Sequence, residues 1–416
     1  MKKQAIGACR KFLKFLPIPF LRKYREWVRR VAVLFLCTAL ILNFCACWNR
    51  RELNTLAIVL GTGLDVGNQP DTLELTAQVV RAGEMKSGGS SPDGSASAEK
   101  AFVNMQGTDK SVLAAVRGIS HMANRRLYFP HNQVLIFSSE LAKQDIAEGL
   151  DAFLRDYEAR MNVHILVSKG KASEVLEEEC ELEKIPSVHI SGMIENQEPN
   201  SETVIVTMRD FAIAMLSGST APVAPMIEVH ESGGKKRGKL EGTAVFKDGK
   251  MVGELDGMQT RGLMFATGKA KSSVITVDTK WGQVVLEMVH SRTSLEPVKA
   301  EDGSIRIELK INENGAIESN ETTEDMSRLE NLELLKKLGQ EAIRSDVESA
   351  LSQARSLSAD VFGFGEAIRR EYPEEWEKMK ENWDEVFREI GLDVQVEVEL
   401  RSTGGLTRPV TPGGAE

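Results

Sequence analysis

Cys47 is the residue of this chain whose type and surroundings point most directly to chemistry. It follows the small residues Cys45 and Ala46 and an almost wholly apolar run, VAVLFLCTALILNF, over 31–44. Residues 1–30 are basic, with Glu26 as their one acid. A basic segment, an apolar core of about 7–15 residues and small residues before the cleavage point are typical of a signal peptide. The sequence therefore predicts a lipoprotein signal over 1–46, with the Cys47 thiolate as the acyl acceptor.

The alternative is an uncleaved membrane anchor. The apolar run is shorter than the roughly 18–20 residues that a spanning helix prefers, which favours cleavage, although the long basic segment favours an anchor. Both interpretations place the body on the outer face of the cytoplasmic membrane, because positive charge stays inside. A diacylglyceryl group on Cys47 brings two chains, enough for stable anchoring in the bilayer.

The residues directly after Cys47 form a predicted membrane-proximal motif of Trp48, Arg50, Arg51 and Glu52. Tryptophan is favoured at the headgroup level of a bilayer, and arginines there can meet anionic lipid. We expect this motif to lie against the membrane surface.

The remaining chemistry-bearing residues form no catalytic or metal-binding pattern, and the sequence predicts no enzyme, no cofactor and no metal site. The six histidines are scattered, and no Gly-x-Ser-x-Gly elbow occurs. His121 and His131 flank a basic cluster that is best explained as a helix C-terminus. Glu177, Glu178 and Glu179 predict a solvated helix face, and the acidic surroundings of Cys180 should raise the pKa of its thiol.

The charge of the chain excludes one class of partner. The 416 residues carry a net charge of −9, although ten basic residues and one acid precede Cys47. The rest of the chain is therefore strongly acidic. Because phosphate contacts need Lys and Arg, we expect no nucleic-acid binding.

An N-terminal mixed α/β domain is predicted over 48–216. Apolar and alternating runs predict strands over 56–65, 72–80, 101–105, 134–137 and 163–167. A helix over 110–123, capped by Asp109, should bury Val112, Leu113, Val116 and Ile119, and a second helix is expected over 141–157. Short helices follow to 216, and the Gly/Ser-rich segment 87–97 predicts a surface loop.

The small residues and prolines of 217–225 indicate a boundary or linker before a central β-rich domain over 226–320. Strands over 240–246 and 251–255 flank Asp248-Gly249, a strong hairpin signal. Further strands are expected over 274–277, 284–289 and 305–311.

The C-terminal domain, 321–410, should combine helices with one strand. A long amphipathic helix is predicted over 329–357, then helix over 360–390 with breaks at 363–365 and Pro373, and a strand over 394–400. Trp376 and Trp383, seven residues apart, would share a helix face. Core packing is the favoured interpretation, and an aromatic ligand platform is the alternative. The expected fold class is α+β: a multi-domain mixed α/β protein with antiparallel and mixed sheets and a helix-rich C-terminal part.

Several stretches of this sequence resemble the Ger(x)C family of spore-germination lipoproteins. They are CWNRRELN at 47–54, LAIVLG at 56–61, GLD at 63–65, LEGTAVF at 240–246, VGEL at 252–255, TRGL at 260–263, DVFGFGE at 360–366, YPEEW at 372–376 and WDEVF at 383–387. They occur in the family's order over nearly the whole chain after Cys47. Asn49 stands where the family usually has Asp, and the basic N-terminus is longer than is typical.

The resemblance implies the C subunit of a nutrient germinant receptor, with a three-domain mixed α/β fold and no known catalytic site. Such subunits act with two integral-membrane receptor subunits, one of them transporter-like and credited with germinant binding, on the outer surface of the spore inner membrane. We expect an accessory or scaffolding component needed for germination signalling. A solute-binding lipoprotein that captures the germinant directly is the alternative, and would need an interdomain cleft. A cortex hydrolase would need a carboxylate pair or a nucleophile at a cleft.

Overall fold

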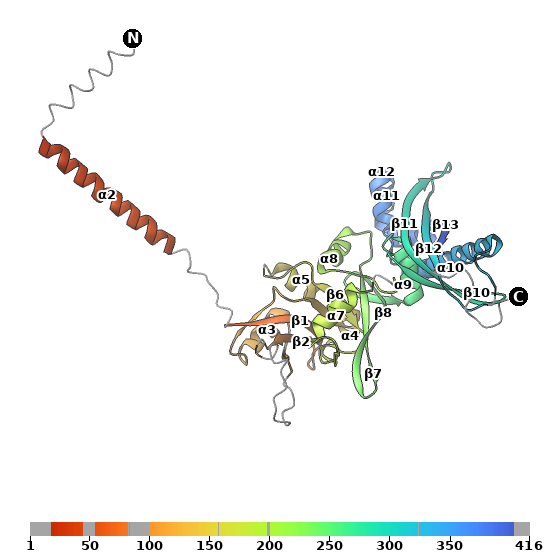
Figure 1. Cartoon of the computed structure of the whole chain (residues 1–416), viewed down its shortest axis with the longest axis horizontal. Coiled ribbons are helices and arrows are strands. Elements are labelled where there is room, and N and C mark those ends of the chain that lie inside the picture. The colour runs from red at the N-terminus through yellow and green to blue at the C-terminus, as the bar shows by residue number, and fades with distance from the viewer. Residues whose placement is uncertain are drawn as a thin grey trace, which may run out of the picture. The chain divides into compact units, whose positions relative to one another are not determined.

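The computed structural model describes residues 18–44, 55–81, 83, 100–156, 158–197, 200–322 and 324–402. The chain falls into two units, Met1–Thr55 and Leu56–Glu416. The described part of the first unit is helix α2 (Ile18–Phe44) with the residue Thr55 (Figure 1). The strands and the other described helices belong to the second unit.

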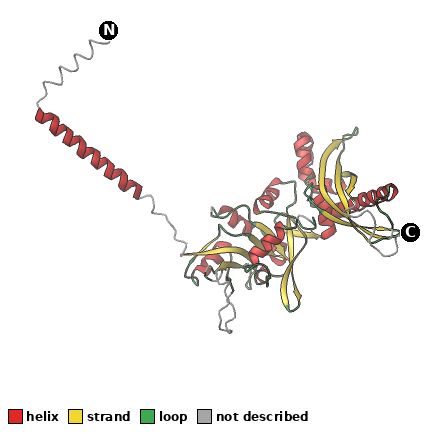
Figure 2. Cartoon of the chain, viewed as in Figure 1, coloured by secondary structure: helices red, strands yellow, loops and turns green. Residues whose placement is uncertain are grey.

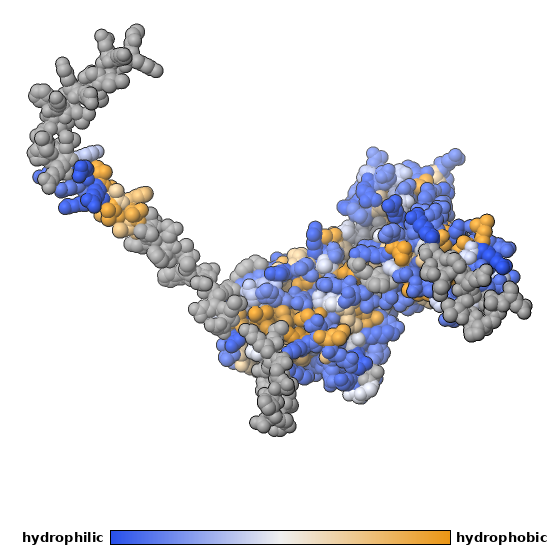
Figure 3. All heavy atoms as spheres, viewed as in Figure 1, coloured by the Kyte–Doolittle hydropathy of each residue, from blue (hydrophilic) through white to orange (hydrophobic). Residues whose placement is uncertain are grey.

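Helix α2 joins two kinds of sequence. Residues 23–30 are mostly charged and 31–37 are apolar, and Figure 3 shows the change from hydrophilic to hydrophobic along the helix. The side chains of 23–38 are exposed. Among the described helices, none combines the length and the apolarity that crossing a membrane requires.

The first sheet of the second unit has a parallel centre and antiparallel flanks. Its order is β3-β2-β1-β5-β6-β7-β8-β9, and β4 pairs with β1. β1, β5, β6 and β7 run parallel, whereas β2, β3, β8 and β9 pair antiparallel with their neighbours. The strands are β1 (Leu56–Val66), β2 (Leu73–Val80), β3 (Phe102–Asp109), β4 (Arg126–Tyr128), β5 (Val134–Ser138), β6 (His164–Ser168), β7 (Val223–Ser232), β8 (Lys235–Lys247) and β9 (Lys250–Leu255). All five residues of β5 are buried, as expected for a central strand covered on both faces.

Short helices pack on this sheet (Figure 2). They are α3 (Val112–Ser120), α4 (Ser139–Gln144), α5 (Ala147–Arg155), α6 (Ala172–Val175), α7 (Pro186–Glu195) and α8 (Met208–Ser217). The strands predicted over 56–65, 72–80, 101–105, 134–137 and 163–167 are confirmed as β1, β2, β3, β5 and β6. The segment predicted as a loop over 87–97 lies outside the described residues.

The start of α3 differs from the prediction. Ser111, not Asp109, is the N-cap, and its Oγ accepts a hydrogen bond from the Ala114 N–H at 3.3 Å. Leu113 is 58% exposed, whereas Ala115 is fully buried. The buried face of α3 runs through Val112, Ala115 and Ile119, so Leu113 points outward.

The helix predicted over 141–157 is wrong, because the structure has two helices there, α4 and α5. Asp145 between them is extended, and its Oδ1 accepts from the Ala147 N–H at 2.7 Å. The Ile146 N–H donates instead to the Gly249 carbonyl at 2.9 Å. A tertiary hydrogen bond therefore replaces a helical one at the break.

The Asp248-Gly249 hairpin is confirmed. Both residues have positive φ, 51° and 79°, as a type I′ turn between β8 and β9 requires. β7 begins at Val223 and pairs with β6, so the first sheet continues across 217–225. The domain division at that segment stays a prediction.

Helix α9 (Gly257–Ala266), which follows β9, was not predicted from the sequence. Asp256 and Gln259 form a capping box: the Gln259 N–H donates to Asp256 Oδ1 at 2.8 Å, and the Asp256 N–H donates to Gln259 Oε1 at 3.0 Å. Residues 263–266 are all buried. A helix covered on every side at its end shows no apolar periodicity.

The second sheet has the order β10-β11-β12-β13 and is also mixed. Its strands are β10 (Ser273–Thr279), β11 (Gly282–Lys299), β12 (Ile305–Asn320) and β13 (Gly391–Ser402). β12 and β13 are parallel, and the crossover between them holds α10 (Leu329–Ser356), α11 (Phe364–Glu371), α12 (Pro373–Met379), the 3-10 helix η3 (Lys380–Asn382) and α13 (Trp383–Glu389). The predicted strands and the long helix are confirmed here.

Trp376 and Trp383 lie in different helices, α12 and α13, so the prediction of one shared helix face is wrong. Their rings meet edge to face with centroids 5.2 Å apart, and both are buried. A Cβ on Gly365 would approach both rings to about 3 Å. The core interpretation is confirmed, and the turn at η3 brings the rings together.

The structure confirms the α+β class. It contains two mixed sheets, and the part after residue 321 is rich in helix.

Candidate functional site

The residues predicted to meet the membrane lie outside the described residues. They are Cys47, Trp48, Arg50, Arg51 and Glu52. Lipidation at Cys47 and the membrane-proximal motif therefore remain proposals. The structure does place the other stretches that carry the family resemblance.

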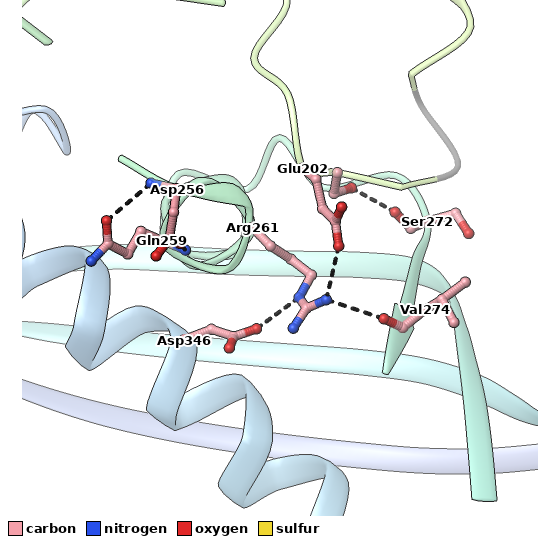
Figure 4. A network of polar contacts seen from close by, with 8 residues as sticks. Glu202, Asp256, Gln259, Arg261, Ser272, Val274 and Asp346 are labelled. Carbon is pink, nitrogen blue, oxygen red and sulfur yellow. Dashed lines mark hydrogen bonds and ion pairs between the residues drawn. The ribbon is translucent and has the colours of Figure 1, made fainter. Parts of the chain in front are cut away.

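The stretch 260–263 forms a junction between four segments (Figure 4). Arg261 on α9 donates from Nε to Asp346 Oδ2 on α10 at 2.7 Å. Its Nη1 reaches Glu202 Oε1 at 3.3 Å and the Val274 carbonyl of β10 at 3.2 Å. Burial raises the pKa of Asp346, and the Arg261 guanidinium opposes that shift. The guanidinium thus links the segment before α8 to the layer of the second sheet.

Close helix packing accompanies this network. A Cβ on Gly262 would lie 2.1 Å from the Asp346 carbonyl oxygen, so α9 can approach α10 this closely only with glycine there. The buried hydroxyls of Thr260 and Thr243 lie 3.0 Å apart and join α9 to β8. These hydrogen bonds of Arg261 all go to groups of the protein itself, so this junction serves architecture.

Asp360 opens the stretch 360–366 and is 4% exposed. Its Oδ1 accepts from the N–H groups of Phe362, Gly363 and Phe364 at 2.9–3.2 Å, and its Oδ2 from that of Gly365 at 2.8 Å. Burial raises the pKa of Asp360 to about 6, and the four N–H donors oppose the rise. The carboxylate holds the turn before α11, where Gly363 has φ +77°.

Asp65 plays a similar part at the end of the stretch 56–65. Its buried carboxylate accepts from the N–H groups of Ala172 at 2.8 Å and Ser173 at 3.0 Å, the first turn of α6. Gly61 and Gly63 let β1 pass close to α7 and α6, where a Cβ would lie 2.6 Å from Ser187 Cβ and 3.1 Å from Ala172 Cβ. These motif residues hold helices on the sheet.

Gln78 on β2 is fully buried and was not among the residues singled out from the sequence. Its Nε2 donates to the Leu176 carbonyl at 2.6 Å, and its Oε1 accepts from the Ser187 N–H at 2.9 Å. A glutamine in an apolar, alternating strand was the one signal available in the sequence.

The helix-end interpretation of the histidine cluster is confirmed for His121, whereas Arg126 lies in β4. His121 is the C-cap of α3, and its N–H donates to the Gly118 carbonyl at 3.1 Å. His131 instead contacts the ring of Tyr128, with centroids 5.9 Å apart.

A polar hollow of about 490 Å³ lies beside β5, β6 and α7. Its lining includes His131, Arg160, His164 and Glu195. Burial lowers the pKa of His164, although Glu195 Oε1 lies 3.8 Å from its Nε2 and opposes the shift. His164 Nδ1 is buried and has no hydrogen-bond partner within the described part of the chain. The hollow offers both charge signs to a small polar molecule.

The prediction that Glu177–Glu179 form a solvated face is wrong for Glu178, which is 3% exposed. Its Oε2 accepts from the Gly238 N–H of β8, and its Oε1 lies 3.7 Å from the Cys180 thiol that donates to it. Burial raises the pKa of Glu178 to about 7. Burial and then the Glu178 carboxylate raise the pKa of Cys180 to about 12, as predicted.

Comparisons with known proteins cover both sheets. The family model described as "Spore germination protein N-terminal domain" matches residues 49–229, and the one described as "Spore germination B3/ GerAC like, C-terminal" matches 241–404. The two matches meet at the β7–β8 hairpin.

Curated relatives match over nearly their whole length. Spore germination protein KC of Bacillus subtilis (strain 168) is 28% identical over 406 residues, which cover 91% of this chain and 97% of the relative. Spore germination protein B3 of the same organism is 23% identical over 377 residues, which cover 88% and 96%. The crystal structure of the GerBC protein matches with a TM-score of 0.55 and 18% identity over 85% of this chain and 99% of that one, a likeness of fold.

Proposed function

Because the chain belongs to the family of GerAC-like spore germination proteins, we propose that it is an accessory subunit of a nutrient germinant receptor. It binds two integral-membrane receptor subunits and stabilises their signalling-competent arrangement. In this proposal it carries out no catalysis. It lies on the outer face of the spore inner membrane.

The extent of the family match carries this proposal. The two matched regions, 49–229 and 241–404, include nearly all of the second unit. The family-like residues Asp65, Arg261 and Asp360 are used inside this unit to fix helices and sheets. A body stiffened in this way offers a preformed surface to partners, which lowers the entropy cost of docking.

The proposed anchor is the diacylglyceryl group on Cys47. It is supported by the order of basic residues, apolar run and small residues before Cys47, and by the polarity of α2. An anchored body is held at high effective concentration near its partners, so weak contacts suffice for assembly. Trp48, Arg50 and Arg51 would add contacts with headgroups.

Co-purification tests the proposed partnership. The full chain carries an affinity tag at its C-terminus, and spore membranes are solubilised in mild detergent. We expect both integral-membrane subunits of one receptor to elute with the chain. In a second experiment the membranes are cross-linked before they are solubilised. Elution of the chain without the two receptor subunits under these conditions would contradict the proposal.

The second candidate function is direct capture of the germinant by a solute-binding lipoprotein. The polar hollow favours it, because Arg160 can meet a carboxylate and Glu195 an ammonium group, and its volume of about 490 Å³ is within the range of small-molecule sites.

Calorimetric titration of the purified protein with amino acids, sugars and nucleosides tests this second function. Saturable heat that is lost in Arg160→Gln would favour germinant capture. If no compound of the panel gives a binding heat, germinant capture is contradicted and the accessory role is favoured. Arg344→Gln is the matched control, because Arg344 lines a different hollow.

A further inference from the structure

Three side chains with different donor atoms meet beside α7, away from the junctions described above. One carboxylate oxygen of Glu178, the Cys180 Sγ and one ring nitrogen of His189 all lie within 4.8 Å of one another. Glu178 is buried, and Cys180 and His189 are half-buried. This cluster could not be predicted from the sequence, because His189 is nine residues from Cys180 and follows no zinc-binding spacing.

The loop that carries Glu178 and Cys180 is fixed to β8 by several contacts. The Glu179 N–H donates to the Lys236 carbonyl at 3.0 Å, and Arg237 pairs with Glu181. The Gly238 N–H holds Glu178 Oε2, which leaves Oε1 directed toward Cys180. An outer hydrogen bond of this kind orients a carboxylate ligand in metal sites. The donors are therefore positioned by the fold, with His189 supplied by α7.

A second group of donors gives a useful contrast. Glu228, His230 and Glu241 also lie within 4.8 Å of one another. There, Lys169 lies 3.3 Å from Glu228 and Lys239 lies 2.9 Å from Glu241, so lysines already balance both carboxylates. For Glu178, by contrast, no ion pair with Lys or Arg occurs among the described residues. In this part of the chain its buried carboxylate therefore has no cationic partner.

We propose that Glu178, Cys180 and His189 bind one Zn²⁺ ion. Oxygen, sulfur and nitrogen donors in one cluster match the ligands that zinc accepts, and three protein ligands leave a fourth position for water. Binding forms a bond from zinc to the Cys180 sulfur and releases the thiol proton to solvent, because a coordinating thiol is deprotonated. The ion supplies the positive charge beside Glu178. It ties the loop after α6 to α7 and, through Gly238, to β8.

Cobalt titration of the full chain in detergent micelles tests this site. The protein is first freed of metal with a chelator, and Co²⁺ is the probe because a cobalt–thiolate bond absorbs in the near ultraviolet. We expect one Co²⁺ per chain with this absorption, and its displacement by Zn²⁺. In Cys180→Ser the absorption should disappear. In His189→Gln it should remain, while zinc affinity, measured by chelator competition, falls at least about ten-fold.

The control is His230→Gln in the lysine-balanced cluster, which should leave absorption and zinc affinity unchanged. Circular dichroism verifies that each variant is folded. The proposal is overturned if the folded wild-type chain shows no cobalt–thiolate absorption, or if Cys180→Ser keeps it. It is also overturned if His189→Gln binds zinc as tightly as the wild type.

Discussion

Arg261 on α9 and Asp346 on α10 form an ion pair with 2.7 Å between Nε and Oδ2, and their side chains are 12% and 3% exposed. The two residues are 85 positions apart in the chain. The pair joins the part of the molecule that follows the first sheet to the long helix of the second sheet. It is one reason why residues after Leu56 form a single compact unit.

Replacement of Arg261 by Ala should be strongly destabilising. The change leaves Asp346 buried without its cation, and loss of one partner of a buried pair costs about 3–5 kcal/mol. Denaturant unfolding followed by circular dichroism measures the loss. The control is Arg369→Ala, because Arg369 pairs with Glu366 on the exposed surface of α11 and its loss should have little effect. Equal stabilities of the two variants would contradict the structural role.

Gly262→Ala should also destabilise the protein, by about 1–3 kcal/mol, because the new Cβ would lie 2.1 Å from the Asp346 carbonyl oxygen. Gly118→Ala in α3 is the matched control, since nothing lies within 4 Å of its Cβ position. Alanine there should stabilise the helix by about 0.5–1 kcal/mol. Thermal unfolding of both variants tests the expected opposite signs.

The burial of Glu313 predicts that the free energy of unfolding depends on pH. It lies on β12, is 2% exposed, and its Oε1 has no hydrogen-bond partner among the described residues. Burial raises the pKa of Glu313 from 4.5 to about 7. Between these values the unfolded chain has released the proton that the folded protein retains. Rising pH therefore favours the unfolded state, and the stability present below pH 4.5 is lost as pH approaches 7.

Glu313→Gln, which is neutral at every pH, should match the wild type near pH 4.5 and exceed it at pH 7. The gap should widen by about 1.4 kcal/mol per pH unit in that window. Urea unfolding at a series of pH values measures it. Glu318→Gln, exposed on the same strand, should show no widening gap. A constant difference between Glu313→Gln and the wild type would refute the assignment.

Local signals explain what the sequence could predict. The Asp248-Gly249 turn needs only two residues that accept positive φ, and the alternating pattern of 394–400 needs only its own side chains. Most strands of the two sheets and the long helix α10 were recognisable for the same reason, but β4 and β7 were not predicted, and β7 begins inside the segment expected to be a linker. The lipidation signal at Cys47 is equally local, although it lies outside the described residues.

The remaining features depend on partners that are distant in sequence. Glu178 is buried because Gly238, 60 residues later, lies against it. The three consecutive glutamates therefore led to the wrong prediction that Glu178 is exposed to solvent. The helix over 141–157 breaks because Ile146 bonds to Gly249. Helix α9 was not predicted because its last turn is buried on all sides, so its sequence lacks an amphipathic pattern. None of these contacts can be read from a local pattern.

Germination of spores that lack this subunit and are complemented with Cys47→Ala tests whether the protein acts as a receptor subunit anchored through Cys47. The measured quantity is the rate of nutrient-triggered germination, compared with complementation by the wild type and by Cys45→Ala. We expect the wild type and Cys45→Ala to restore germination. The Cys47→Ala protein should be produced in normal amounts but be absent from the membrane fraction, and it should restore little germination. Full restoration by a Cys47→Ala protein that is absent from membranes would contradict an anchored receptor subunit.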